Sequence, residues 1–246
     1  MQLIPKVIHY CWFGKTEKPI SVEKCIESWH RLCPDYEIKE WNEDNYDIHK
    51  HPFMEKAFTD KKWAFVSDYA RLDILYTYGG LYLDTDVEIV KNFDRLLKNH
   101  AFMGFERDDL VGDGAGFGCV AGLNIFEEMM RCYDDMFEYI ESPKLRTVIL
   151  LKHGLILNGK KQDVDEVRVY PVEYFCPKNY LTGVVKVTSN TYSIHHFDGS
   201  WHEGNSEIYV GLMRFLNRRF GEEKGLVIFN YIVGVKDKIK KLLGRD

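Results

Sequence analysis

A helical pattern followed directly by a strand pattern limits the folds open to this chain. Apolar residues recur at three- and four-residue spacing over residues 62–78, and Gly79 and Gly80 end the predicted helix. The segment GGLYLDTDVEIV then carries Asp84 and Asp86 at the end of a short apolar strand. Sheets in α/β proteins bind ligands at the carboxyl ends of their strands, so this helix-to-strand unit predicts a binding site at the two aspartates.

Two aspartates so close together need a compensating positive charge. Side chains alternate along a strand, so Asp84 and Asp86 are expected to point to the same side of the backbone. A divalent cation such as Mg²⁺ or Mn²⁺ takes carboxylate oxygens and leaves positions open for substrate phosphates. Two aspartates at this spacing also occur in solvated turns, but turn aspartates seldom follow a segment as apolar as GGLYL. The context therefore favours a metal site.

The N-terminal part predicts the order strand, helix, strand. Residues 6–13 are rich in β-branched and aromatic types and end at Gly14. The segment SVEKCIESWHRL, residues 21–32, has helical spacing, and Ser21 can cap its start. DYEIKEW then alternates like a second strand. This order indicates an α/β fold.

Length and composition set the number of domains. With 246 residues, of which 45% are hydrophobic, the chain can bury a sizeable core as one α/β domain, or as one domain with a small appendage. We expect a main domain over residues 1–205 and a helical, basic segment over residues 206–246. From Lys224 to Asp246, six Lys or Arg stand against two Asp, a balance of +4. This segment is either a solvated surface helix or an amphipathic segment lying on an anionic membrane face.

Charge and cysteine usage exclude some classes of protein. The net charge of -5 argues against broad nucleic-acid binding. The six cysteines form no CxxC pair, which fits free thiols in a reducing cytosol. The N-terminus lacks the pattern of a cleaved signal, and the apolar stretch 225–235 is well short of the roughly 20 residues of a membrane-spanning helix. We therefore expect a cytoplasmic protein.

Polar residues elsewhere are further candidates for a site. Asp68 and Arg71 share a face of the predicted helix; they form either an exposed ion pair or a grip on sugar hydroxyls and phosphate. In SIHHFDGSW, alternation along a strand would put His195 and His196 on opposite faces, so only one should reach the metal site. The segment GDGAGFGC, residues 112–119, breaks the dinucleotide-binding glycine order and is interpreted as a flexible binding loop.

Several blocks in a fixed order resemble a known family. IPKVIHYCWFG, SDYARLDILYTYGGLYLDTDVE, VYPVEYFCP and HHFDGSW together resemble the DXD-containing sugar transferases of the capsular polysaccharide and mannosyltransferase type. These are also similar to the glucosyltransferase domains of the large clostridial toxins. The resemblance runs from about residue 4 to about residue 202. It implies a GT-A-type, Rossmann-like fold with a mixed central sheet, a nucleotide-sugar donor, Mn²⁺ or Mg²⁺, and retention of the anomeric configuration.

The resemblance also assigns roles near the aspartate pair. Trp12 resembles the aromatic residue that stacks on the nucleotide base, and Asp68 and Arg71 resemble the pair that holds the donor sugar. Tyr82 and Asp84 correspond to residues near the ribose, with Asp84 also reaching the metal through water. Asp86 corresponds to the direct metal ligand. The catalytic group implied by the resemblance is therefore Asp68, Arg71, Asp84 and Asp86.

The final block supplies the remaining candidates. His196 resembles the late metal ligand of the family, and Asp198 is an alternative at that place. Ser200 and Trp201 resemble residues near the donor diphosphate.

The predicted function is metal-dependent, retaining transfer of a hexose from a nucleotide sugar, with a UDP-sugar favoured, to a glycan or lipid-linked acceptor in capsular or other surface polysaccharide synthesis. One alternative is a haloacid-dehalogenase-like magnesium phosphatase. That class needs Thr or Val two residues after the second aspartate, where Glu88 stands, and its motif follows the first strand. Another is a non-catalytic carbohydrate-binding protein, whose aromatic residues would stack on sugars.

Overall fold

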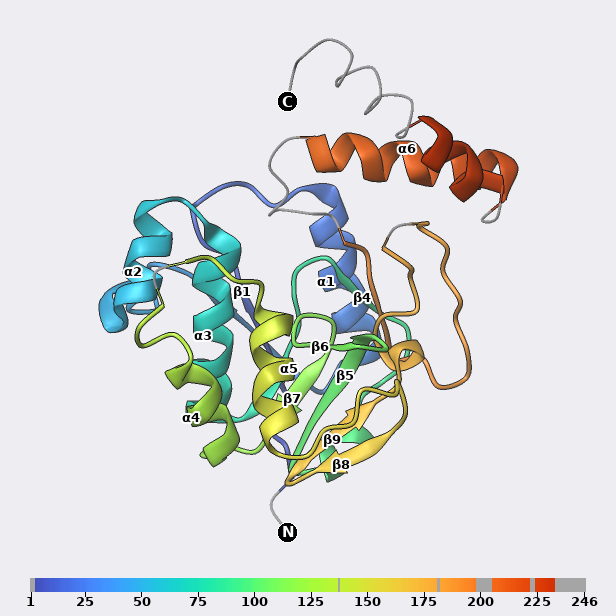
Figure 1. Cartoon of the computed structure of the whole chain (residues 1–246). Coiled ribbons are helices and arrows are strands. Elements are labelled where there is room, and N and C mark those ends of the chain that lie inside the picture. The colour runs from blue at the N-terminus through green and yellow to red at the C-terminus, as the bar shows by residue number, and fades with distance from the viewer. Residues whose placement is uncertain (1–2, 137, 181, 198–204, 222–223, 233–246) are drawn as a thin grey trace. The chain divides into compact units, whose positions relative to one another are not determined.

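The computed structural model describes residues 3–136, 138–180, 182–197, 205–221 and 224–232 (Figure 1). The chain divides into two compact units, and the first contains all described residues of the candidate site. The units are Met1–Pro177 with Lys186–Asp198, and Lys178–Val185 with Gly199–Asp246. The boundary at residue 205 stays a prediction, because residues 198–204 lie outside the described part of the chain.

The secondary structure alternates between helices and strands over most of the first unit. The helices are α1 Ile20–Leu32, α2 Pro52–Thr59, α3 Trp63–Tyr78, α4 Asn124–Arg131, α5 Ser142–Lys152 and, in the second unit, α6 Asn205–Phe220. Short 3-10 helices are η1 Ile48–Lys50, η2 Leu96–Lys98 and η3 Val172–Tyr174. The strands are β1 Val7–Cys11, β2 Glu37–Trp41, β3 Gly80–Tyr82, β4 Val87–Ile89, β5 Ala101–Arg107, β6 Leu110–Gly112, β7 Phe117–Cys119, β8 Gln162–Val164, β9 Val167–Tyr170 and β10 Ser193–His195.

The central sheet mixes parallel and antiparallel strands. Its order is β2-β1-β3-β7-β5-β9-β8, with β6 paired to β5. β1 runs parallel to β2 and β3, whereas β7 lies antiparallel between β3 and β5. β4 and β10 form a separate two-stranded sheet. The prediction of an α/β fold with a mixed central sheet is therefore confirmed.

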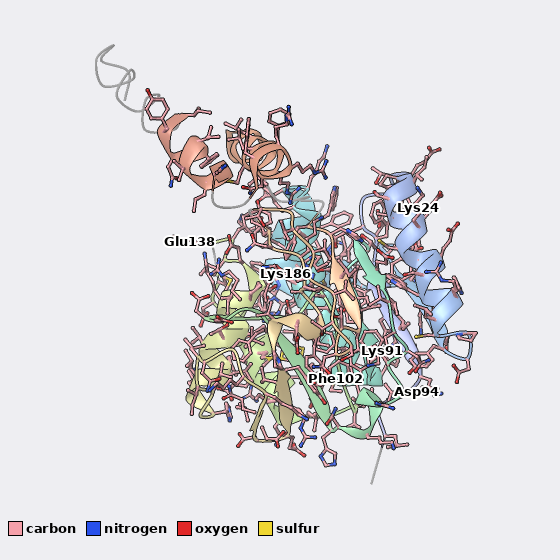
Figure 2. The ribbon with its side chains drawn as sticks, turned by 90° about the vertical axis from the view of Figure 1, so that its right-hand side faces the viewer. Lys24, Lys91, Asp94, Phe102, Glu138 and Lys186 are labelled. Carbon is pink, nitrogen blue, oxygen red and sulfur yellow. The ribbon has the colours of Figure 1, made fainter. Side chains whose placement is uncertain are left out.

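Helices cover the sheets of the first unit. α3 contacts α4, α4 contacts α5, and these helices lie side by side in Figure 1. α1 packs against β4, where the buried Trp29 donates its indole N–H to the Val87 carbonyl oxygen at 2.7 Å. Figure 2 shows Lys24 on α1 at the margin of the unit and Phe102, which is fully buried, among the strands. The Trp29 bond fixes the first residue of β4 directly after the aspartate pair.

The start of α1 differs from the prediction. The helix begins at Ile20, and the residue before it, Pro19, makes no side-chain capping bond. The Pro19 carbonyl accepts the first bonds, from the N–H groups of Val22 and Glu23 at 2.9 and 3.2 Å. Ser21 therefore lies inside the first turn, and its prediction as the N-cap is wrong.

The glycines after α3 let the helix end and β3 begin without a linker. Gly79 ends α3 at a φ of 66°, and its N–H donates to the Leu75 carbonyl oxygen at 2.8 Å, as the predicted C-cap requires. A Cβ on Gly80 would lie 2.9 Å from the Val7 carbonyl oxygen. Glycine at this position therefore permits the close approach of β3 and β1.

The glycine-rich segment is a buried bend, residues 113–116, together with the strand ends on either side of it. All residues from 112 to 119 are buried, β6 ends at Gly112, and β7 begins at Phe117. A Cβ on Gly118 would lie 2.6 Å from the Gly80 carbonyl oxygen of the neighbouring strand. Burial argues against the flexibility predicted for this segment, and Gly118 permits close strand packing, whereas its role in binding stays a prediction.

Two further sequence expectations concern thiols and membrane spans. All six cysteines are free thiols, and five of them are buried. Within the described parts of the chain, no helix has both the length and the apolar character needed to cross a membrane.

Candidate active site

The aspartate pair lies in a turn between β3 and β4. β3 ends at Tyr82, and the Val87 N–H donates to the Asp84 carbonyl oxygen at 3.1 Å, which closes the turn. The Asp84 N–H donates to the Gly114 carbonyl oxygen at 2.8 Å. Because the backbone turns here, the predicted strand alternation does not set the directions of the two carboxylates. Asp84 faces Arg71, and Asp86 faces His195.

Arg71 of α3 is the positive centre of the site. Its guanidinium lies 2.9 Å from Asp84 Oδ1, 3.1 Å from Asp113 Oδ1 and 3.2 Å from Asp68 Oδ1. The same group lies 4.8 Å from the centre of the Tyr82 ring. Its side chain is only 3% exposed, which excludes the exposed ion pair that the sequence left open for Asp68 and Arg71. The cation instead offsets carboxylates from three separate segments.

Asp68 is a fully buried carboxyl group with unused hydrogen-bonding capacity. Neither of its side-chain oxygens accepts a hydrogen bond from a described residue, although Arg71 Nη2 lies nearby. Burial raises the pKa of Asp68 to about 7, and the charge of Arg71 opposes this rise. Buried polar atoms normally have partners, so these oxygens are suited to accept hydrogen bonds from a ligand.

Asp113 and Arg146 belong to the same cluster. Arg146 of α5 donates from Nε to Asp113 Oδ2 at 2.6 Å, and Ser142 donates from Oγ to Asp113 Oδ1 at 2.8 Å. Arg146 Nη2 also donates to the Asp68 carbonyl oxygen and to the Tyr133 hydroxyl, at 3.0 and 2.9 Å. Burial raises the pKa of Asp113, but the two arginines outweigh burial and hold that pKa below its usual value.

The sequence reasoning missed these two residues. Asp113 stands between glycines, and this pattern was interpreted as a loop. Arg146 is one of three basic residues in a short helix. The one signal that Arg146 could be buried was the apolar run that follows it in α5. That signal is weak, because a surface helix can show the same pattern.

His195 and His196 have different carboxylate partners, as expected for side chains on opposite faces, and His195 is the one beside Asp86. β10 pairs with β4, so His195 lies opposite Val87, and its Nε2 lies 3.2 Å from Asp86 Oδ1. His196 Nε2 lies 3.0 Å from Glu88 Oε2. Burial lowers the pKa of His195, but Asp86 outweighs it and raises that pKa well above its usual value. The role of His196 as metal ligand stays a prediction, and the geometry adds His195 as the nearer imidazole.

Glu106 of β5 is a further carboxyl group close to the site. Burial raises its pKa, the charge of His195 lowers it, and the charges of Asp113 and Asp84 raise it. The alternating pattern of β5 gave no reason to single this residue out.

The residues predicted to bind the nucleotide are Trp12, Tyr82, Ser200 and Trp201, and the structure describes the first two. Trp12 follows β1, is partly buried, and donates its indole N–H to the Thr16 carbonyl oxygen at 2.8 Å. Tyr82 is 1% exposed and supports the Arg71 guanidinium with its ring. Their roles in nucleotide binding stay predictions. Asp198, Ser200 and Trp201 lie outside the described residues.

The donor atoms fit a divalent metal that is shared with a ligand. Asp84 and Asp86 offer carboxylate oxygens, which Mn²⁺ and Mg²⁺ accept, whereas the His195 imidazole pairs with Asp86. Within the described ranges, no three His, Cys, Asp or Glu side chains are arranged so that they could hold a metal ion by themselves. The site therefore suits an ion whose coordination is completed by phosphate oxygens, which is a common mode for Mg²⁺.

A Gly114→Ala substitution is expected to displace Asp84. A Cβ at this position would lie 2.0 Å from Asp84 Oδ2 and 3.6 Å from Arg71 Nη1. Because the Asp84 carboxylate and the residue 114 backbone cannot both keep their positions, we expect metal-dependent nucleotide binding to weaken by about 10- to 100-fold, as for changes that reorient a ligand. Calorimetric titration of Mn²⁺ with UDP checks this. A Gly122→Ala variant, where an added Cβ has nothing within 4 Å, serves as the control, although its φ of 78° adds some strain. Equal binding by both variants would contradict the expectation.

Asp68 is expected to make stability depend on pH. Its pKa is raised from 3.8 to about 7 by burial, so the folded state holds the proton more tightly than the unfolded state does. The stability that the protonated Asp68 contributes to the folded state is fully present below about pH 4 and is lost as the pH rises through about 7. Between about pH 4.5 and about pH 7.5, the wild type should therefore lose stability relative to Asp68→Asn. Urea unfolding of both proteins measures this, and a pH-independent difference would count against it.

Comparison with known proteins supports a specific family for this site. A family model described as a glycosyltransferase sugar-binding region containing a DXD motif matches residues 19–103, which include Asp84 and Asp86. The match confirms the resemblance seen in the sequence.

Curated relatives of the chain carry mannosyltransferase names. Inositol phosphoceramide mannosyltransferase 2 of Schizosaccharomyces pombe is 32% identical over 220 residues, covering 87% of this chain and 63% of that protein. Inositol phosphoceramide mannosyltransferase 3 of the same yeast is 34% identical over 114 residues, covering 41% of this chain and 29% of that protein. The chain thus spans less than two thirds of either relative.

A solved structure, the PaToxG glycosyltransferase, is also similar. It is 17% identical, with 61% of this chain and 69% of that chain covered and a TM-score of 0.49.

Proposed function

We propose that this chain, whose residues 19–103 carry the glycosyltransferase sugar-binding region with the DXD motif, is a metal-dependent glycosyltransferase of the GT-A type. It moves a hexose from a nucleotide sugar to a glycan or lipid-linked acceptor. The observation that carries this proposal is the junction of α3, β3 and β10, where Arg71 holds Asp84 and His195 stands beside Asp86. That junction supplies both a cation-binding turn and a fixed positive charge.

Each described residue has a role that follows from its position. Asp84 and Asp86 would hold Mn²⁺ or Mg²⁺ together with phosphate oxygens of the donor, and the bound ion would supply Lewis-acid neutralisation of the departing diphosphate. Arg71 presents a permanent positive charge beside the same carboxylates and favours the anionic leaving group. The Asp68 oxygens, which accept no hydrogen bond from a described residue and of which Oδ1 lies 3.2 Å from Arg71 Nη2, would accept hydrogen bonds from sugar hydroxyls. Together these groups orient the donor and favour bond cleavage.

The stereochemical proposal is retention by a front-face route. The departing phosphate helps to deprotonate the acceptor, and the nearby carboxylates stabilise positive charge on the sugar ring. Glu106 is a partly buried carboxyl group close to the site, so it is the residue to test for a covalent alternative. If a sugar ester were trapped on Glu106, the reaction would proceed through a covalent intermediate and the front-face route would be wrong.

The donor is proposed to be a UDP-sugar, and nucleotide-activated mannose is the second choice. The relatives named for mannose transfer support mannose as the sugar. A few contacts to one hydroxyl separate glucose, galactose and mannose, so a direct screen has to decide between them.

The acceptor is proposed to be a glycan or a lipid-linked glycan at the cytoplasmic face of a membrane, within capsular or other surface polysaccharide synthesis. In the second unit, Phe215 and Phe220 of α6 are exposed, and Arg218 and Arg219 lie in its last turn. Exposed aromatic and basic side chains on one helix suit an anionic lipid surface. Most of the basic segment, residues 233–246, lies outside the described part of the chain.

The alternative functions explain less of the site. A phosphatase of the haloacid-dehalogenase kind needs its first aspartate as a free nucleophile, but Asp84 Oδ1 is paired with Arg71 at 2.9 Å. The motif also follows β3, and the first strand, β1, ends at Cys11. A carbohydrate-binding protein would not require Arg71 among buried carboxylates.

A donor-hydrolysis screen tests the proposed function. The protein is incubated with UDP- and GDP-sugars, with and without Mn²⁺, and the released nucleotide is measured. Metal-dependent release from one donor is the expected result. Release of phosphate from simple phosphomonoesters, with no nucleotide release from any donor, would favour the phosphatase instead.

A further inference from the structure

Asp113 joins the two buried arginines of the site. Its Oδ1 accepts hydrogen bonds from Arg71 Nη1 at 3.1 Å and from Ser142 Oγ at 2.8 Å. Its Oδ2 accepts one from Arg146 Nε at 2.6 Å. Asp113 is 1% exposed and Arg146 is fully buried, so water does not compete for these bonds. The carboxylate is therefore held on both oxygens.

This bond holds one end of the Arg71 guanidinium, whose Nε also donates to the Ser67 carbonyl oxygen of α3 at 3.2 Å. A guanidinium is planar, with its donors in a fixed fork, so fixing one Nη fixes the direction of the other. With Nη1 on Asp113, Nη2 lies 2.9 Å from Asp84 Oδ1 and 3.2 Å from Asp68 Oδ1. Without Asp113, the fork could turn away from Asp84. Asp113 thus anchors the guanidinium from outside α3, in addition to the Ser67 carbonyl oxygen within the helix.

Arg146, on the other side of Asp113, holds α3 in place at Asp68. Arg146 Nη2 donates to the Asp68 carbonyl oxygen at 3.0 Å and to the Tyr133 hydroxyl at 2.9 Å. This arginine therefore ties α5 to the turn of α3 that carries Asp68 and, three residues later, Arg71. The segment before β7, α3 and α5 are held together by a single chain of charge-assisted hydrogen bonds.

We propose that Asp113 is a positioning residue, which Ser142 and Arg146 hold in place and which directs Arg71 toward Asp84 and the donor diphosphate. The inference rests on the proposed function and adds a residue outside the DXD turn to the donor-binding site.

A double-mutant cycle on Asp113→Asn and Arg71→Lys tests the inference. Lysine keeps the positive charge but lacks the fork that spans Asp113 and Asp84. In the wild-type background, Asp113→Asn should raise the donor KM and lower kcat/KM for nucleotide release by about 10- to 100-fold. In the Arg71→Lys background, the same substitution should change kcat/KM by less than about threefold, because the two residues act as one unit. Asp163→Asn, in the exposed pair with Arg168, is the matched control and should leave both parameters unchanged.

Each outcome separates the inference from the proposed function. An equal loss from Asp113→Asn in both backgrounds would mean that Asp113 acts independently of Arg71, which overturns the inference. Donor turnover that Asp113→Asn leaves unchanged would also overturn it, while the proposed function stands. Absence of turnover by the wild type with every donor would count against the proposed function itself.

A milder variant covers the case in which Asp113→Asn does not fold. Ser142→Ala removes one donor to Asp113 Oδ1 and keeps the buried charge pairs intact. It should lower donor kcat/KM by about two- to tenfold, the range that the net contribution of one hydrogen bond allows, and again only when Arg71 is present. Circular dichroism and the thermal midpoint confirm folding of each variant. A Ser142→Ala effect of the same size in the Arg71→Lys background would contradict positioning.

Discussion

Replacing Arg71 by methionine is expected to lower the free energy of unfolding by about 3–5 kcal/mol. The guanidinium of Arg71 lies within 3.2 Å of Asp68, Asp84 and Asp113, and its side chain is 3% exposed. Methionine fills similar space but leaves three neighbouring carboxylates without their shared cation. An uncompensated buried charge costs far more than a lost surface ion pair. Urea unfolding monitored by tryptophan fluorescence gives the difference directly.

An exposed arginine provides the control for this prediction. Arg168 pairs with Asp163 at 2.6 Å, but its side chain is 38% exposed. Arg168→Met should therefore cost no more than about 1 kcal/mol. If Arg71→Met costs as little as Arg168→Met, the buried cluster does not depend on Arg71 for its charge balance.

Asp86→Asn is expected to remove metal-dependent donor turnover almost completely, with a loss of about 10²- to 10³-fold in kcat. The side chain is 17% exposed and stands beside His195, where it can reach a bound cation. Asparagine keeps the size of the side chain and can still accept a hydrogen bond from His195, so the fold should persist. The loss should therefore come from weaker charge neutralisation at the diphosphate. Nucleotide release at saturating donor measures it.

The matched control for Asp86 is another turn aspartate. Asp44 lies in a surface turn, where it pairs with Lys15 at 2.7 Å and its side chain is 70% exposed. Asp44→Asn should keep wild-type turnover and the wild-type Mn²⁺ dependence. Full turnover by Asp86→Asn at low Mn²⁺ would remove the reason to place a metal at this turn.

Local patterns predicted the elements that carry the site. α3 begins and ends within one residue of the predicted limits, because the helical spacing and the Gly79 cap are both local signals. The alternation along β10 correctly separated His195 from His196. It could not tell which of the two faces Asp86, because that depends on the register of β10 against β4.

Contacts between distant segments escaped prediction for a physical reason. Asp113 reaches Arg71 because β7 inserts antiparallel between β3 and β5, and no local pattern determines that order. Its flanking glycines suggested mobility, whereas the sheet uses Gly118 for close packing. Arg146 lies in a short helix that looks like a surface helix until α5 is placed against β6 and α4, where Arg146 reaches the Asp68 carbonyl oxygen of α3. The charge balance of the site is therefore a property of the tertiary structure.

Calorimetric titration of UDP, in the presence and absence of Mn²⁺, tests most directly the claim that the DXD turn binds a nucleotide diphosphate through a metal. The wild type should bind UDP at least about tenfold more tightly with Mn²⁺, and Asp86→Asn should lose that gain, because one charged ligand accounts for roughly this factor. The same titration with GDP covers the second choice of donor. Equal affinity with and without Mn²⁺ for both nucleotides in the wild type would contradict the account.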